Sequence, residues 1–306
     1  MRSLTTYKNI LKQKGLRYSV AEVWRLIDRF HYIKDQGLLE QVWLHKISKR
    51  LKKRYAHFEH SYSSQITIPN PYPDKIWVCW LQGEKNAPLL VKKCIASIRK
   101  YAADKEVIII TNDNLSQYIT FPDFILKNKI KGRITNTHFS DIIRIYLLAK
   151  YGGIWIDATV YLTGPLPAYA LNTPLFCYKT SLSETEPIKM SSWFISAQPN
   201  HEIIVRTQQL ITEYWKHNTW LCHYYLFHLL FSIAIDSKTH LKEQWKAIPY
   251  FNSCIPHTLS TEITNSYQIE RWEQIKQISS IHKLTYKLSP EIYEQKNTFL
   301  QLLLNN

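Results

Sequence analysis

Two carboxylates and one arginine stand at spacings that suit the binding of a polar ligand. Asp141 and Arg144 are three residues apart in a stretch of helical periodicity, so they share one helical face. Asp157 follows a short apolar run at residues 154–156, which predicts a strand. A carboxylate at the carboxyl end of such a strand is where a ribose or a nucleotide-bound metal ion is met. A local ion pair between Asp141 and Arg144 is the competing interpretation.

The neighbouring sequence predicts the elements that position these side chains. Ser140 is a good N-cap for the helix that carries Asp141, and the adjacent pair Gly152-Gly153 suits the end of that helix. The turn would deliver Asp157 to the edge of a sheet.

Upstream, short apolar runs at residues 75–80 and 107–110 predict two strands, with a helix at residues 89–101 between them. The fully apolar run 107–110 is typical of a strand buried on both faces of a mostly parallel sheet. The order strand, helix, strand predicts an α/β fold with a nucleotide-type crevice.

Composition bounds the remaining possibilities. The chain has 306 residues, 45% of them hydrophobic, which excludes intrinsic disorder as its main description. Five cysteines form no CxxC pair, so we expect neither a disulfide framework nor a cysteine zinc site, and a reducing cytoplasm fits best. Lysines interrupt the first apolar stretches, and the longest apolar run falls short of a bilayer span, so we expect no signal peptide and no membrane span.

The net charge of +15 is concentrated near the N-terminus, where residues 1–60 hold 14 basic and 5 acidic residues. Helical spacing of apolar residues at 20–33 and 38–47 predicts a basic helical segment over residues 1–65. Its charge fits a solvated helix end, or a surface for an anionic membrane or an acidic partner. Nucleic acid is disfavoured as a partner, because no zinc finger or RNP signature accompanies the charge.

The segment Ser-Asp-Ile-Ile-Arg at 140–144, followed by Tyr-Gly-Gly-Ile-Trp-Ile-Asp at 151–157, resembles the donor-site signature of glycosyltransferases with a DXD sugar-binding region. The likeness is to capsular polysaccharide synthesis glycosyltransferases, glycosyltransferase family 32-like, and residues 76–83, 192–195 and 281–287 resemble further blocks of that group. The resemblance implies a GT-A catalytic domain, a Rossmann-like nucleotide-sugar-binding fold, over residues 66–306. Additional helices would flank it at both ends.

The resemblance also implies roles for individual residues. Asp141, Arg144 and Asp157 are the expected catalytic residues. Ser140, Asp141 and Arg144 would hold the donor's ribose and sugar hydroxyls, and Asp157 would bind the donor as the first aspartate of the DXD motif. The other expected donor-binding residues are Cys79, Trp80, Thr111, Asn112, Gly153, Thr159, His282 and Lys283. The expected acceptor-side residues are Trp193 and, on one helix, His223 and His228.

The DXD pattern is incomplete, because Asp157 supplies its first aspartate and Thr159 stands at the second. We expect a divalent cation, Mn²⁺ or Mg²⁺, with Asp157 as its ligand. In one alternative, Asp157 holds the metal with help from the diphosphate and a C-terminal residue. In the other, His282 and Lys283 replace part of the metal's charge.

These features together predict a cytoplasmic bacterial glycosyltransferase, peripheral at the inner face of the cell membrane. It would transfer a hexosyl or N-acetylhexosaminyl group, with retention favoured by the resemblance, from a UDP-sugar to a glycan acceptor on a lipid carrier or to a growing capsular polysaccharide. The alternative is a non-catalytic scaffold of the same fold, which Thr159 alone supports. An NAD-dependent enzyme is disfavoured, because no G-x-G-x-x-G motif follows a strand.

Overall fold

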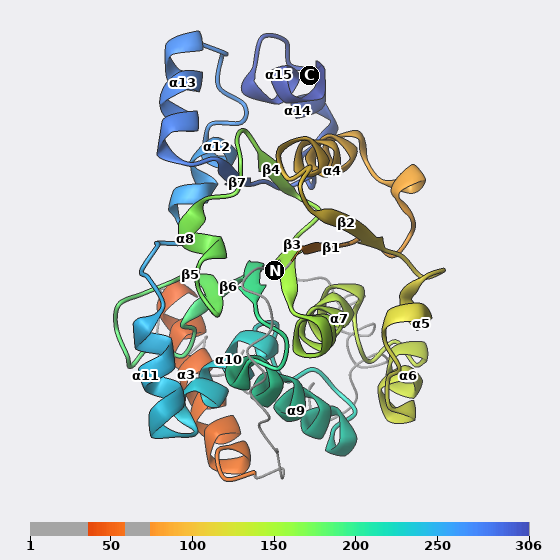
Figure 1. Cartoon of the computed structure of the whole chain (residues 1–306), viewed down its shortest axis with the longest axis vertical. Coiled ribbons are helices and arrows are strands. Elements are labelled where there is room, and N and C mark those ends of the chain that lie inside the picture. Colours follow the sequence, from red (N-terminus) through yellow and green to blue (C-terminus); the bar gives the residue numbers. More distant parts are fainter. Residues whose placement is uncertain (1–35, 59–73, 306) are drawn as a thin grey trace.

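The computed structural model describes residues 36–58 and 74–305 (Figure 1). The longer helices are α3 (Gln36–Tyr55), α4 (Leu89–Tyr101), α6 (Asp123–Ile130), α7 (Asn136–Tyr151), α9 (Glu202–His217), α10 (Leu226–Asp236), α11 (Thr239–Ala247), α13 (Ile269–Ile278) and α15 (Phe299–Asn305). The short helices are α5 (Leu115–Tyr118), α8 (Ala168–Leu171), α12 (Thr258–Thr261) and α14 (Pro290–Glu294). The strands are β1 (Lys75–Cys79), β2 (Glu106–Ile110), β3 (Gly153–Ile156), β4 (Val160–Leu162), β5 (Leu175–Lys179), β6 (Met190–Ala197) and β7 (Ile281–Lys283).

A five-stranded sheet in the order β2-β1-β3-β6-β5 forms the centre of the fold. β1 pairs in parallel with β2 and β3, whereas β6 pairs antiparallel with β3 and β5. The α/β class is therefore confirmed, but the sheet is mixed rather than mostly parallel. The prediction that residues 107–110 are buried on both faces is wrong, because β2 is one of the two outer strands and Val107 and Ile109 are only partly buried.

A second, two-stranded sheet joins the C-terminal part of the chain to the segment after β3. β4 and β7 pair antiparallel, with Val160 opposite Lys283 and Leu162 opposite Ile281. Helix α12 packs against β7, and α15 packs against α4. Figure 1 shows these C-terminal helices, in blue, grouped around α4 and β4 at the end of the molecule opposite α3.

Helix α3 packs against α10 at that other end (Figure 1). Ile47, Leu51 and Tyr55 of α3 are buried in the same hydrophobic cluster as the central strands. The helix expected from residues 38–47 is confirmed, whereas the one expected from residues 20–33 lies outside the described residues. The boundary between residues 65 and 66 stays a prediction. None of the helices in the described part of the chain is long and apolar enough to cross a membrane.

Helix α7 and the turn after it set the position of β3. The helix begins five residues earlier than expected, because the Thr135 hydroxyl accepts a hydrogen bond from the His138 amide at 3.2 Å and caps it. The prediction of Ser140 as the N-cap is therefore wrong. The two glycines do end the helix, with φ of +63° at Gly152 and +102° at Gly153, which L side chains rarely adopt.

Candidate functional site

Asp157 lies at the centre of a charged cluster built from three elements. It follows β3, whereas Arg144 comes from α7 and Lys283 is the last residue of β7. Arg144 Nη2 donates to Asp157 Oδ1 at 2.9 Å, and Lys283 Nζ donates to Asp157 Oδ2 at 3.0 Å. The Asp157 amide donates to the carbonyl of Trp193 at 2.9 Å, which fixes its backbone beside β6.

Arg144 also joins Asp157 to Asp141, because its Nη1 donates to Asp141 Oδ1. Its guanidinium lies 4.6 Å from the centre of the Trp155 ring and 5.4 Å from that of Phe227. Only 4% of the Arg144 side chain is exposed, and its Nε has no hydrogen-bond partner within the described residues. Buried donors without a partner are rare, so this N–H is well suited to a ligand oxygen.

The pairing keeps both carboxyl groups ionised. Burial raises the pKa of Asp157, but Lys283 and Arg144 outweigh burial and hold that pKa below its usual range. Burial also raises the pKa of Asp141, but Arg144 and the neighbouring His138 together outweigh burial and lower that pKa. The charged cluster, which we define as Asp141, Arg144, Asp157 and Lys283, therefore carries two negative and two positive charges at neutral pH.

His138 lies beside Asp141 and was not predicted from the sequence. The indole N–H of Trp215 on α9 donates to His138 Nε2 at 3.0 Å. Because an indole nitrogen only donates, Nε2 accepts and the neutral ring carries its proton on Nδ1. That Nδ1 lies 3.4 Å from Asp141 Oδ2. His138 is three residues before Asp141, and Arg144 is three residues after it. The same helical spacing could therefore have predicted that His138 shares a face of α7 with Asp141.

Trp155 is a second residue that the sequence reasoning did not assign to the site. Its Nε1 donates to Asp157 Oδ1 at 2.8 Å, alongside the bond from Arg144. The two residues stand two apart at the end of β3, so strand alternation places their side chains on one face. This spacing of two residues in a predicted strand could have identified Trp155 as a neighbour of Asp157 from the sequence.

Three of the expected donor-binding residues, Trp80, Thr111 and Asn112, gather where β1 and β2 end. The Trp80 amide donates to the Ile110 carbonyl, and the Asn112 amide donates to the Leu81 carbonyl, both at 2.9 Å. Thr111 begins the turn after β2, and its amide donates to Asn114 Oδ1 at 2.8 Å. The two strand ends are thus held side by side, which brings Trp80, Thr111 and Asn112 together.

Cys79 connects these strand ends to the charged cluster. Burial raises the pKa of its thiol to about 12, while a hydrogen bond with Ser140 and the charge of Arg144 act in the opposite direction. The thiol is therefore protonated, and it points from the end of β1 toward Ser140 of α7. Trp80 meets Tyr286 edge-on, with ring centres 5.4 Å apart, so part of the C-terminal block 281–287 also lies here.

The three expected acceptor-side residues have different surroundings. Trp193 is buried and stacks on Tyr178 with ring centres 4.8 Å apart, so its indole packs in the core. His223 precedes α10 instead of lying on a helix, and its Nδ1 accepts from the Tyr225 amide at 3.0 Å. His228 lies on α10, where burial lowers its pKa to about 4 although Asp141 raises it. His228 is therefore a neutral group close to the charged cluster.

Of the two adjacent residues on β7, only Lys283 reaches Asp157. His282 points to the opposite face, where its Nε2 lies 2.9 Å from Thr163 Oγ1 and burial lowers its pKa to about 4. Lys283 Nζ donates both to Asp157 and to Thr159 Oγ1, the latter at 2.5 Å. Gly153, also expected at the donor, contributes the turn and close packing against Trp77.

The side chains around Asp157 do not fit a divalent metal ion bound through that residue. Mg²⁺ and Mn²⁺ are held by oxygen ligands, yet both carboxylate oxygens of Asp157 already accept hydrogen bonds from cationic groups. Among the residues that the structure describes, no three His, Cys, Asp or Glu side chains gather as metal ligands would. The expected divalent cation stays a prediction that this donor set disfavours.

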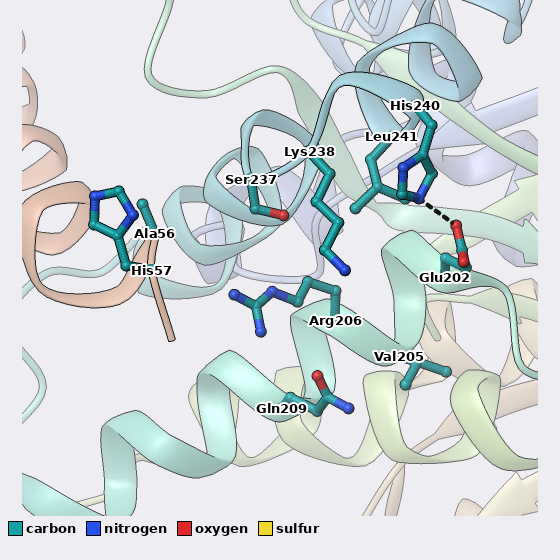
Figure 2. A pocket seen from close by; sticks show the side chains of 10 residues that line it. All are labelled: Ala56, His57, Glu202, Val205, Arg206, Gln209, Ser237, Lys238, His240 and Leu241. Carbon is teal, nitrogen blue, oxygen red and sulfur yellow. Dashed lines mark hydrogen bonds and ion pairs between the residues drawn. The ribbon is translucent and has the colours of Figure 1, made fainter. Parts of the chain in front are cut away.

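A polar pocket lies at another place, between the end of α3 and helices α9 and α11 (Figure 2). Arg206 and Lys238 point into it, and His240 Nε2 lies 2.8 Å from Glu202 Oε2 at its edge. None of the predicted site residues lines it. We therefore place the candidate site at the charged cluster and the strand ends beside it.

Comparisons with known proteins add a family and several relatives. A family model described as "Capsular polysaccharide synthesis protein" matches residues 27–303. The O-glycosyltransferase braB of Annulohypoxylon truncatum is 27% identical over 150 residues, which cover 46% of this chain and 34% of that protein. The glycosyltransferase afumC of Aspergillus fumigatus is 23% identical over 171 residues, which cover 50% and 42%. The matches thus span less than half of these curated relatives.

Two solved structures are also similar. The "PaToxG Glycosyltransferase" aligns with a TM-score of 0.41 and 15% identity over 87% of this chain and 98% of its own. A transferase mutant aligns with a TM-score of 0.38 and 12% identity, over 58% and 91%.

Proposed function

The chain belongs to the family of capsular polysaccharide synthesis proteins, and we propose that it is a glycosyltransferase that uses a nucleoside diphosphate sugar, with UDP as the nucleotide. The observation that carries the proposal is the arginine that joins two ionised carboxylates at the carboxyl end of β3. The printed names of the two fungal relatives support the same activity. The assignment to glycosyltransferase family 32 and the bacterial source stay predictions.

In this proposal the charged cluster positions the donor. Asp141 and Asp157 accept hydrogen bonds from ribose or sugar hydroxyls, and the free Nε of Arg144 donates to a neighbouring oxygen. The Lys283 ammonium lies on the far side of Asp157, where it would meet the diphosphate. Fixed orientation of the anomeric carbon and stabilisation of the departing charge are the two contributions that such groups make to catalysis.

We propose that the sugar is transferred with retention. The bond from the anomeric carbon to the phosphate oxygen breaks while the acceptor oxygen bonds to the same face, and the departing phosphate takes the acceptor's proton. No side chain needs to be a strong base in this step. The nearby neutral His228 is compatible with it, because a buried imidazole with a pKa of about 4 is a weak base at neutral pH.

We further propose that a hexosyl or N-acetylhexosaminyl group passes to a glycan acceptor on a lipid carrier or to a growing surface polysaccharide. The acceptor would lie at the cytoplasmic face of an anionic membrane. The exposed lysines and arginines of α3 support this proposal, because each basic side chain near such a surface contributes about 1 kcal/mol of attraction.

The activity is tested by hydrolysis of UDP-sugars by the intact chain and by the variants Asp141→Asn and Asp157→Asn. We expect each variant to lower the hydrolysis rate by about 100-fold or more, because each removes a charge that positions the donor. Asp104→Asn, at an exposed aspartate on the loop before β2, is the matched control and should keep full activity.

Circular dichroism must show that the variants stay folded. Hydrolysis that survives both substitutions at the site would contradict the proposal. A non-catalytic scaffold predicts instead that the unaltered chain hydrolyses no nucleotide sugar under any condition.

A further inference from the structure

Lys283 occupies the position between the two residues that align with the aspartates of a DXD motif. Its Nζ donates to Asp157 Oδ2 at 3.0 Å and to Thr159 Oγ1 at 2.5 Å. In that motif the same two positions provide oxygens for a divalent cation. Here their oxygens meet around an ammonium group instead.

The backbone holds Lys283 firmly in this place. β7 pairs with β4, which begins directly after Thr159, and Lys283 stands opposite Val160 in the register. The Leu284 amide donates to the Thr159 carbonyl at 2.9 Å. Residues on both sides of Lys283 are buried, whereas 17% of its own side chain is exposed, so a ligand can reach it.

The charges in the cluster already balance. Asp141 and Asp157 contribute two negative charges, and Arg144 and Lys283 contribute two positive ones. A metal site needs surplus negative charge, which a second carboxylate at position 159 would supply and a threonine does not. A divalent cation beside Asp157 Oδ2 would also be repelled by the ammonium that contacts the same oxygen.

We propose that the Lys283 ammonium takes the place of the divalent cation, so that this chain binds the diphosphate of its donor without a metal ion. The inference rests on the proposed function, since it concerns how that donor is held. Lys283 keeps its bond to Asp157 and turns a remaining N–H toward the diphosphate. As the bond from the sugar to the phosphate breaks, the developing negative charge meets a fixed positive charge.

The first test needs no variant. Binding of UDP, GDP and ADP to the full chain is measured by calorimetry in EDTA, in Mg²⁺ and in Mn²⁺, and electron paramagnetic resonance follows the free Mn²⁺ signal. We expect at least one nucleotide to bind in EDTA with a Kd within about threefold of that in either metal. Adding the protein to a fixed mixture of Mn²⁺ and that nucleotide should cause no loss of the free Mn²⁺ signal. A Kd that rises more than tenfold in EDTA and recovers with Mn²⁺ would overturn the Lys283 proposal and leave the proposed function standing.

The second test changes the charge. Lys283→Met should weaken nucleotide binding by about 10- to 100-fold in EDTA, because it removes a charged hydrogen-bond donor. Lys287→Met, at an exposed lysine in the same block, is the matched control and should bind like the unaltered chain. Thermal melting checks the fold of both. An unchanged Kd in folded Lys283→Met overturns the inference, and a chain that binds no nucleotide in any buffer overturns the proposed function with it.

Discussion

Arg144 connects the part of the site on α7 with the part that follows β3. Its two terminal nitrogens donate to different carboxylates, Asp141 on its own helix and Asp157 beyond the glycine turn. A buried charge that loses one partner is strongly destabilising, whereas the intact group adds little net stability. The arrangement is therefore better explained as positioning of oxygens for a ligand than as a device for stability.

Three buried histidines predict how stability depends on pH. Burial lowers the pKa of His201, His228 and His282 from 6.5 to about 4. Between those pH values the unfolded chain binds more protons than the folded chain. The contribution of these histidines to stability is therefore fully present above pH 6.5 and is lost as the pH falls toward 4. Each unit of pKa difference is worth about 1.4 kcal/mol, so one such histidine contributes up to about 3 kcal/mol.

Thermal melting at intervals from pH 7 to pH 4 measures this loss. His282→Gln should flatten the curve, because it removes one of the three groups, and His57→Gln at an exposed position should leave the slope unchanged. Asp141 and Asp157 add no pH dependence between pH 7 and pH 4. Because their pKa values are lowered in the folded chain, the stability that they contribute is lost only below about pH 4. A melting temperature that stays constant down to pH 4 would contradict the prediction.

Residue spacing predicted the part of the site that is local in sequence. Asp141 and Arg144 could be paired from helical periodicity, and the same rule could have found His138. The contact between Lys283 and Asp157 joins residues 126 positions apart, and only the pairing of β4 with β7 creates it. The sequence therefore predicted that Lys283 or His282 contacts the donor site, but it could not distinguish between them. In the structure, strand alternation places the His282 side chain on the opposite face of β7 from Asp157.

At the scale of elements, α7, the glycine turn and β3 form one unit that carries Asp157 into the site. Apolar periodicity and the glycine pair predicted this unit with small errors at its boundaries. The same reasoning was wrong about the sheet, because a short apolar run does not reveal whether a strand is central or outermost. β2 is apolar and outermost, and the antiparallel β6 beside β3 had no local signature.

The glycine turn predicts a graded effect of added methyl groups on stability. A Cβ at Gly153 would lie 2.7 Å from Trp77 Nε1 and 2.8 Å from the Lys75 carbonyl, whereas one at Gly132 would meet nothing within 4 Å. Both glycines have positive φ, so Gly132→Ala carries the backbone cost alone, about 1–2 kcal/mol. Gly153→Ala adds overpacking of about 1–3 kcal/mol.

Urea denaturation of the two variants gives the comparison. We expect Gly153→Ala to lose clearly more free energy of unfolding than Gly132→Ala. Its hydrolysis rate should also fall, because the turn places Asp157. Equal losses in the two variants would show that close packing against Trp77 does not constrain the turn.

At the scale of the whole molecule, helix α3 contributes both to the hydrophobic core and to the exposed positive charge. α3 buries Ile47, Leu51 and Tyr55 in the main hydrophobic cluster, and Lys52 pairs with Asp236 of α10 at 3.1 Å. Its remaining basic side chains are exposed. Deleting the N-terminal segment would therefore damage the core as well as remove the charge, and a test of membrane binding has to change the exposed charges alone.

Lys49→Glu with Lys53→Glu reverses two exposed charges one helical turn apart on α3. Lys127→Glu with Lys131→Glu has the same spacing and the same change in net charge, with Lys127 in the last turn of α6 and Lys131 just beyond its end. If α3 docks on an anionic surface, the first pair should weaken binding to phosphatidylserine-containing vesicles by roughly 10-fold or more, at about 1 kcal/mol per basic residue near the surface. The second pair should reduce binding much less, and 0.5 M salt should abolish the difference because it screens exposed charges. Equal loss in both variants would mean that only net charge drives adsorption, and α3 would then be an ordinary solvated helix.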